Sequence, residues 1–207
     1  MDHIIDFYFD FISPYGYFAA MQVEDVARRH NVTVRWHVFR LGVAVVKVMG
    51  LRPMMETPLK NAYVLRDVER LSAIYALPIV LTAKAPDPVL LGSAFYAVKE
   101  AHPNCLPAFS KALFTHVWQH GESITDAEQL IAVALRAGVD AEEMFSPPAM
   151  EAGRLRLRDA TEKAIGRGIF GSPTFVVGNE MIWGVDRLWM LEYYLRKQHD
   201  RSVANLG

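Results

Sequence analysis

Hydrophobic and polar residues change their spacing along the chain, and each change predicts where a strand or helix lies. Residues 3–11 are dense in Ile, Phe and Tyr, which is typical of a strand buried on both faces. Residues 14–31 predict one helix, because apolar side chains recur at helical spacing at Ala19, Val23, Val26 and Ala27. Residues 32–39 alternate and predict a second strand. Strand, helix and strand together form a right-handed parallel unit.

From about residue 60 to residue 166 the spacing is helical, and strand-like runs are scarce. Thr125 and Glu128 have the spacing of a capping box at the start of one helix. Pro, Gly and Asn divide the region into five predicted helical segments, which are 60–76, 92–101, 107–119, 126–137 and 148–165. The sequence therefore predicts an all-helical insertion.

The strand pattern returns after Gly171. Residues 173–183 predict a hairpin that turns at Gly178-Asn179. Asp186 is placed to cap a final helix, whose apolar face carries Leu188, Leu191 and Leu195. Strands therefore come from both ends of the chain and predict an α/β fold with a four-stranded mixed sheet. The expected organisation is a discontinuous sheet domain at 1–50 and 166–207, with an inserted helical domain at 51–165.

Composition excludes several classes of function. The 207 residues include 22 basic and 23 acidic side chains, mixed along the chain, so we expect no nucleic-acid partner. No apolar run approaches the roughly 20 residues of a membrane span, and Asp2 and Asp6 replace a basic leader, so we expect a cytoplasmic protein that does not bind membranes. Cys105 is the single cysteine, which excludes an internal disulfide and fits a small apolar role.

Two short patterns resemble site motifs without the required context. Gly166, Gly168 and Gly171 match a dinucleotide fingerprint, but here a predicted helix precedes the glycines and a strand follows, which is the reverse of that motif. His116 and His120 are four residues apart on a predicted helix, and the only further ligand near them in sequence is Glu122. We therefore expect neither a nucleotide site nor a metal site.

Ser13 ends the first predicted strand and directly precedes Pro14, which is the position of a helix N-cap. The first N–H groups of a helix have no intrahelical partner, so a thiolate or another anion beside Ser13 would meet oriented donors. Serine is a preferred cap in any protein, and a purely structural role is the alternative at this position.

Ser172-Pro173 opens the third predicted strand and suits a cis X-Pro bond. With a cis bond, the N–H and C=O groups of Ser172 would be available at the sheet end for a peptide-like ligand. Proline is otherwise only a strand starter here. Because the first and third strands are neighbours in the predicted sheet, Ser13 and Ser172 are expected to face each other.

Residues 6–15 and 171–188 resemble thioredoxin-fold proteins with a helical insertion, the DsbA-like group, and this likeness spans nearly the whole chain. The similarity is strongest to the branch that contains 2-hydroxychromene-2-carboxylate isomerases and kappa-class glutathione transferases. The disulfide oxidoreductases of the group carry Cys-x-x-Cys where this chain has Ser13 and Gly16, which argues against dithiol exchange.

The resemblance implies glutathione as cofactor and assigns roles to several residues. Ser13 would donate a hydrogen bond to the glutathione sulfur, and Ser172-Pro173 would pair with its cysteinyl part. Val185 and Asp186 would hold the γ-glutamyl end, and Lys60 the glycine carboxylate.

The substrate side is expected to include Lys47 near its mouth, with Tyr15, Tyr17 and Phe39 lining it. Leu51 departs from the family asparagine, so a polar contact to glutathione or substrate is expected to be missing.

Three functions are consistent with the resemblance. The leading one is a glutathione-dependent cis-trans isomerase of aromatic 2-oxo acids, acting by reversible thiolate addition. The alternatives are a kappa-like transferase or peroxidase, and a noncatalytic glutathione-binding domain. The resemblance also implies a homodimer.

Overall fold

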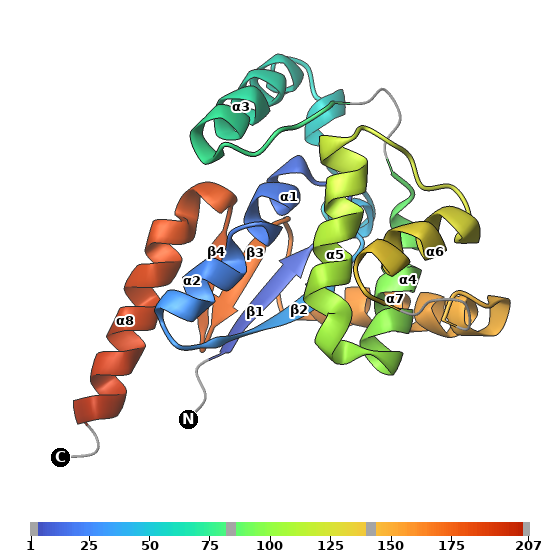
Figure 1. Cartoon of the computed structure of the whole chain (residues 1–207). Coiled ribbons are helices and arrows are strands. Elements are labelled where there is room, and N and C mark those ends of the chain that lie inside the picture. The colour runs from blue at the N-terminus through green and yellow to red at the C-terminus, as the bar shows by residue number, and fades with distance from the viewer. Residues whose placement is uncertain (1–3, 82–85, 140–143, 205–207) are drawn as a thin grey trace.

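The sheet has the mixed topology that the sequence predicts. The computed structural model describes residues 4–81, 86–139 and 144–204 (Figure 1). The strand order is β2-β1-β3-β4, in which β1 pairs with β2 in parallel and the other pairs are antiparallel. The strands are β1 (Ile4–Phe9), β2 (Thr33–Val38), β3 (Thr174–Val177) and β4 (Glu180–Trp183). Both ends of the chain therefore contribute to one sheet.

The predicted single helix after Ser13 is two helices. The structure has α1 (Pro14–Ala20) and α2 (Val23–Arg29), separated by Met21 and Gln22. The Gln22 side-chain amide donates a 2.8 Å hydrogen bond to the Phe18 carbonyl and so satisfies backbone at the break. Asn31, with φ of 53°, lies between α2 and β2 in the left-handed region that asparagine tolerates.

Helices fill the sequence between β2 and β3, as predicted. They are α3 (Lys60–Tyr75), α4 (Pro88–Ala101), α5 (Leu106–Phe114), α6 (Ala127–Arg136) and α7 (Pro147–Gly166). Shorter 3₁₀ or π-helical segments are η1 (Val43–Val48), η2 (Met54–Glu56), η3 (Pro103–Cys105), η4 (Thr115–Gln119) and η5 (Val185–Arg187). The final helix is α8 (Leu188–Ala204). Among the described residues, no helix has both the length and the apolar content needed to span a bilayer.

Three predicted helices lie where the sequence places them but differ from the prediction in detail. The helix expected at 92–101 begins at Pro88, because the Asp87 carboxylate accepts from the N–H groups of Val89 and Leu90. The helix expected at 107–119 becomes π-helical from Thr115. The capping pair expected at Thr125 and Glu128 is shifted by one residue, because the N-cap is Asp126, which accepts from the Gln129 N–H at 2.9 Å.

Aromatic side chains of β1 join the sheet to the helices. Phe9 lies 5.7 Å from Phe95 of α4 and 5.4 Å from Phe114 of α5, measured between ring centroids. Trp118 donates its indole N–H to the carbonyl of Phe11 at 2.9 Å. Figure 1 shows α3 over the end of the sheet at which α1 begins. The turn that carries Ser13 is thus held between the aromatic core and α3.

Candidate functional site

Ser13 is the N-cap of α1, as predicted. Its backbone is extended, with φ of −96° and ψ of 115°, and its hydroxyl oxygen accepts from the Gly16 N–H at 3.0 Å. Pro14 occupies the first helical position, which needs no N–H donor. Only 4% of Ser13 is exposed, so its hydroxyl lies in a setting where hydrogen bonds are poorly screened by water.

Ser13 and Ser172 face each other, as the predicted strand order requires. The Ser13 hydroxyl donates to the Ser172 carbonyl at 3.1 Å, and the Asp10 N–H donates to the Ser172 hydroxyl at 3.1 Å. The Ser172–Pro173 bond is cis, which also agrees with the prediction. The Ser172 C=O, which the sequence predicted to be available to a ligand, already accepts one hydrogen bond from Ser13 and keeps one lone pair for another donor.

Gly16 allows the two serine segments to approach closely. A Cβ added at Gly16 would lie 3.0 Å from the Ser172 hydroxyl oxygen and 3.3 Å from the Asp10 carbonyl oxygen. Those contacts are tighter than ordinary packing. The residue that replaces the second cysteine of the oxidoreductases therefore has a steric reason to be glycine.

Asp10 is a buried carboxyl beneath the Ser13 turn that sequence reasoning missed. Its carboxylate oxygens accept from the N–H of Leu41 at 2.8 Å and from the N–H of Ile12 at 3.3 Å. Burial raises the pKa of Asp10 to about 7, although these backbone donors and the charge of Arg40 act to lower it. An acidic residue between Phe9 and Phe11 in a buried strand was the available signal. Through these two bonds, Asp10 connects Leu41, which follows β2, to the turn that carries Ser13.

Tyr15 points to α3, and its hydroxyl donates to the Asp67 carboxylate at 3.0 Å. Burial, and next the bond to Asp67, raise the pKa of Tyr15 above its ordinary value, and the charge of Asp186 adds to this effect. Tyr15, Asp67 and Asp186 therefore share one electrostatic environment. Sequence reasoning missed Asp67, since nothing in a helical sequence shows which distant tyrosine its carboxylate meets.

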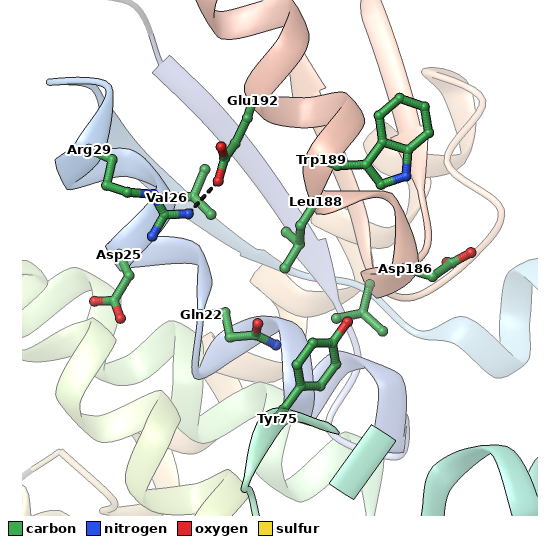
Figure 2. Close-up of a pocket in the computed structure, with 10 residues that line it drawn as sticks. Gln22, Asp25, Val26, Arg29, Tyr75, Asp186, Leu188, Trp189 and Glu192 are labelled. Carbon is green, nitrogen blue, oxygen red and sulfur yellow. Dashed lines mark hydrogen bonds and ion pairs between the residues drawn. The ribbon is translucent and has the colours of Figure 1, made fainter. Parts of the chain in front are cut away.

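A cavity of about 380 Å³ lies beside these residues, between α2, α8 and the end of α3. Figure 2 shows Tyr75 of α3 on one side, Leu188 and Trp189 of α8 on another, and the paired Arg29 and Glu192 at the far end. Its lining residues are Gln22, Asp25, Val26, Arg29, Tyr75, Val185, Asp186, Leu188, Trp189 and Glu192. The structure thus brings Val185 and Asp186 together in one cavity.

The sequence predicted that Asp186 caps the final helix directly, and the structure corrects this. It lies in η5, the 3₁₀ turn Val185–Arg187, and α8 begins after that turn at Leu188. The Asp186 carboxylate accepts from the Arg187 guanidinium at 3.2 Å. The extra turn separates Asp186 from the helix start and leaves its carboxylate exposed at the cavity.

The two lysines occupy different places. Lys60 is the exposed first residue of α3, seven residues before Asp67 and so on the same helix face, about 10 Å away along the axis. Lys47 is an exposed residue of η1 and lines a second cavity, whose lining includes neither Ser13 nor Ser172. Leu51, also near this segment, is 55% exposed.

Two residues expected to line the substrate mouth are buried instead. Tyr17 and Phe39 are both 0% exposed. Tyr17 donates its hydroxyl to the Pro78 carbonyl at 2.9 Å, and Phe39 belongs to a small core beneath β1 and β3. The expectation for these two aromatics is wrong, because each side chain points into packing that the sequence pattern did not reveal.

The structure also shows where the glycine and histidine patterns that resemble site motifs lie. A Cβ at Gly171 would lie 2.2 Å from the indole nitrogen of Trp183, so the absence of a side chain at this glycine permits a close approach to β4. His116, His120 and Glu122 lie close together, with one ligand atom from each within 4.8 Å of the others. Burial lowers the pKa of His116. The nearby Glu122 carboxylate acts in the opposite direction, because it favours the charged imidazole.

Comparisons with known proteins agree with this architecture. A family model described as the DSBA-like thioredoxin domain matches residues 4–196. A 2-hydroxychromene-2-carboxylate isomerase of Sphingobium xenophagum is 32% identical over 196 residues, covering 94% of this chain and 99% of that protein. Human glutathione S-transferase kappa 1 is 27% identical over 209 residues, covering 92% and 90%.

A solved structure of a 2-hydroxychromene-2-carboxylate isomerase superposes with a TM-score of 0.82 at 30% identity, covering 99% of each chain. A disulfide reductase of Pseudomonas aeruginosa, solved with glutathione, has a TM-score of 0.66 at 15% identity, covering 95% of this chain and 99% of that one, which shows a shared fold only. The chain belongs to the DSBA-like thioredoxin domain family, in the branch of 2-hydroxychromene-2-carboxylate isomerase and kappa-class glutathione transferase enzymes.

Proposed function

We propose that this protein is a glutathione-dependent cis-trans isomerase of aromatic 2-oxo acids such as 2-hydroxychromene-2-carboxylate. The observation that carries the proposal is the buried pairing of the Ser13 hydroxyl with the Ser172 carbonyl at the end of the sheet. Relatives that share about a third of the sequence bear the name of that isomerase, which supports the reaction class.

The residues around Ser13 suit a bent tripeptide such as glutathione. The Ser172 carbonyl is the acceptor for a peptide N–H, and its two lone pairs allow a second donor beside Ser13. The cavity at Val185 and Asp186 carries carboxylates for an ammonium group, and Tyr75 lines one side of it. Lys60 lies on the face of α3 that carries Asp67. It supplies a cation for the glycine carboxylate at the other end of glutathione.

Ser13 acts in this proposal as a hydrogen-bond donor and does not attack the substrate. A serine hydroxyl carries one proton, which the Ser172 carbonyl accepts in the structure. In the proposed complex the Ser13 proton turns from that carbonyl to the sulfur, while the carbonyl accepts the peptide N–H of the ligand. A free thiol has a pKa of about 8.5, and a donor to its charged form lowers that value by about one unit for each 1.4 kcal/mol of added stabilisation.

Glutathione supplies the thiol that adds reversibly to a conjugated double bond and is regenerated when the isomer leaves. This chain holds the sulfur at Ser13, keeps water from it by burial of the turn, and orients the acid with Tyr15 and with Lys47 at the mouth of the substrate site. No residue of the chain needs to change its oxidation state. The single Cys105 and the reliance on a reduced thiol fit the cytoplasm, where we place the protein.

The second candidate is a kappa-like transferase or peroxidase. Kappa-class glutathione transferases of rat and human match over more than nine tenths of this chain, and the Ser13 turn would serve both reactions equally. The two functions differ in what happens to glutathione, which a transferase consumes and an isomerase returns.

A glutathione balance decides between these functions. The purified chain is incubated with 2-hydroxychromene-2-carboxylate and glutathione at a hundredth of its concentration, while free thiol and isomerised product are both followed. We expect many turnovers per glutathione with no loss of thiol. Turnover of chlorodinitrobenzene with stoichiometric thiol loss, and none of the chromene acid, would establish the transferase. If neither acid nor chlorodinitrobenzene reacts but glutathione raises the melting temperature, the chain is a binding domain.

A further inference from the structure

A second cavity of about 380 Å³ lies between the segment after β2 and the helix α7. None of the residues that line it belongs to the glutathione cavity at Val185 and Asp186. Pockets of this size accommodate small organic molecules. Of the residues that line this cavity, the proposed function uses only Lys47.

The α7 wall of the cavity has an apolar base and a charged rim. Leu157, Thr161 and Ile165 follow each other at four-residue spacing and form one row along the helix. Arg154, Arg158 and Glu162 form the neighbouring row and are exposed. Val43 and Val89 complete the apolar lining from η1 and α4. A ligand that fills this cavity meets hydrocarbon below and charged groups above.

Positive charge dominates the polar lining, with four basic side chains and one carboxylate. Arg154 is held by two hydrogen bonds to Glu151, and Arg158 lies 3.4 Å from Asp159, so both are neutralised by neighbours on α7. For Arg40 and Lys47, no ion pair is found in the part of the chain that the structure describes. These two cations project from the segment after β2 and are the ones available to a ligand.

Arg40 carries the strongest sign of a missing partner. Its Nε atom is buried, and among the described residues no acceptor is within hydrogen-bond distance of it. The Arg40 backbone is fixed, because its N–H donates to Thr161 at 3.1 Å, and Thr161 donates to Leu157 at 2.7 Å. A buried guanidinium N–H without an acceptor costs free energy, which an anionic ligand would recover.

Asp10 does not fill that role. The charge of Arg40 acts on the Asp10 carboxyl, but no hydrogen bond joins the two groups. The Asp10 oxygens accept from the backbone of Ile12 and Leu41 instead. The unpaired N–H of Arg40 therefore calls for an acceptor from outside the chain.

We propose that this cavity is a binding site for an organic carboxylate with an apolar body, anchored by Arg40 and assisted by Lys47. The carboxylate lies against the guanidinium, and the hydrocarbon rests on Val43, Val89 and Leu157. An inorganic anion would leave that apolar lining unfilled. Two sources supply such a ligand, namely the aromatic acid of the proposed reaction and a different carboxylate that binds apart from turnover.

Binding of 2-naphthoate, measured by isothermal titration calorimetry, tests the site directly. We expect saturable one-to-one binding to the unmodified protein, also when glutathione is already saturating. The neutral 2-naphthamide should bind at least about tenfold more weakly, since it cannot form a charge-assisted pair. Displacement of naphthoate by glutathione, equal binding of the amide, or equally tight binding of inorganic phosphate would overturn the proposal.

Arg40→Met removes the charge and keeps most of the side-chain length. We expect it to weaken naphthoate binding about tenfold or more and to leave naphthamide unchanged. Lys163→Met is the matched control, because Lys163 is an exposed cation of α7 outside the cavity, and it should bind naphthoate like the parent protein. Unaltered naphthoate binding in Arg40→Met would refute the anchor. If that variant fails to fold, the comparison of acid and amide on the parent protein still decides the matter.

The source of the ligand follows from kinetics of the same variants. A rise of about tenfold in KM for the isomerised acid in Arg40→Met, with KM for glutathione unchanged, identifies the site as that of the substrate. An unchanged KM beside lost naphthoate binding identifies a separate carboxylate. Absence of any turnover in the parent protein would refute the proposed function and leave the binding result standing.

Discussion

The Ser13 hydroxyl lies 3.1 Å from the Ser172 carbonyl oxygen, although 159 residues separate the two serines in sequence. Parallel pairing of β1 with β2 and antiparallel pairing of β1 with β3 bring the two segments to the same sheet end. The same hydroxyl oxygen accepts from the Gly16 N–H, and its one proton can be donated to only one acceptor at a time, which in the structure is Ser172. Whatever occupies the site competes with Ser172 for that proton.

Ser13→Ala should lower turnover by about one to three orders of magnitude, since one donor to a developing negative charge contributes that much. The substitution also removes a helix cap, which costs about 1 kcal/mol of stability. Asp126→Ala is the matched control, because it removes the N-cap of α6 far along the chain and should cost similar stability with turnover retained. Initial rates and thermal melts of both variants give the answer, and equal turnover in Ser13→Ala and Asp126→Ala would remove Ser13 from the reaction.

Asp10 should make stability depend on pH near neutrality. Its carboxyl has a pKa of about 7 in the folded chain, against about 3.9 when unfolded, so the folded state binds more protons between these values. Stability from this group is therefore present below about pH 4 and is lost as pH rises to about 7. Asp10→Asn imitates the protonated carboxyl and should abolish that loss.

The measurement is the melting temperature of Asp10→Asn minus that of the parent protein, followed from pH 4 to pH 8. We expect the difference to grow as pH rises from about 4 to about 7 and to level off as pH approaches 8. His37 and His116, whose pKa values burial lowers, act in the opposite direction but cancel in the difference. Asp159→Asn, which removes an exposed carboxylate of α7, is the matched control. A flat difference for Asp10→Asn would show that its carboxyl titrates normally.

The hydroxyl of Tyr15 ties α1 to α3 through Asp67. Tyr15→Phe removes that bond without changing the ring, so α3 should hold its position over the site less firmly. We expect KM for glutathione to rise about threefold to tenfold, which corresponds to a partly exposed hydrogen bond to a charged acceptor. Tyr63→Phe, on the exposed side of α3, is the control. Equal KM values for glutathione in the two variants would show that the bond between Tyr15 and Asp67 does not contribute to glutathione binding.

The sheet and the serine pair were predictable because their signals are local. Alternation in residues 32–39 and the hairpin at Gly178-Asn179 fix strand positions, and pairing then places Ser13 beside Ser172. The break between α1 and α2 was not predictable in the same way. The apolar spacing of the sequence continues across Met21 and Gln22. The break between the helices is accompanied by the hydrogen bond from the Gln22 side chain to the Phe18 carbonyl, which the spacing does not reveal.

The distant partners of Tyr15 and Tyr17 could not be predicted from the sequence for a different reason. The same aromatic residue type faces α3 at Tyr15 and is buried at Tyr17, because helical neighbours two positions apart point to different sides. The partners Asp67 and Pro78 lie far along the chain and follow no motif. Arg40 likewise stands in an ordinary loop sequence, and only its buried, unpaired nitrogen distinguishes it.

The α4–α7 packing should be very sensitive to one methyl group at Gly153. A Cβ there would lie 2.2 Å from the Ser93 carbonyl oxygen, which belongs to backbone and cannot turn away. Gly153→Ala should therefore lower the free energy of unfolding by about 1 to 3 kcal/mol or more, despite the better helix propensity of alanine. Gly166→Ala, at the end of the same helix with open space around it, should be neutral or stabilise by up to about 1 kcal/mol. Urea denaturation of the two variants measures both values, and a Gly153→Ala protein as stable as Gly166→Ala would mean that α4 and α7 do not pack this closely in solution.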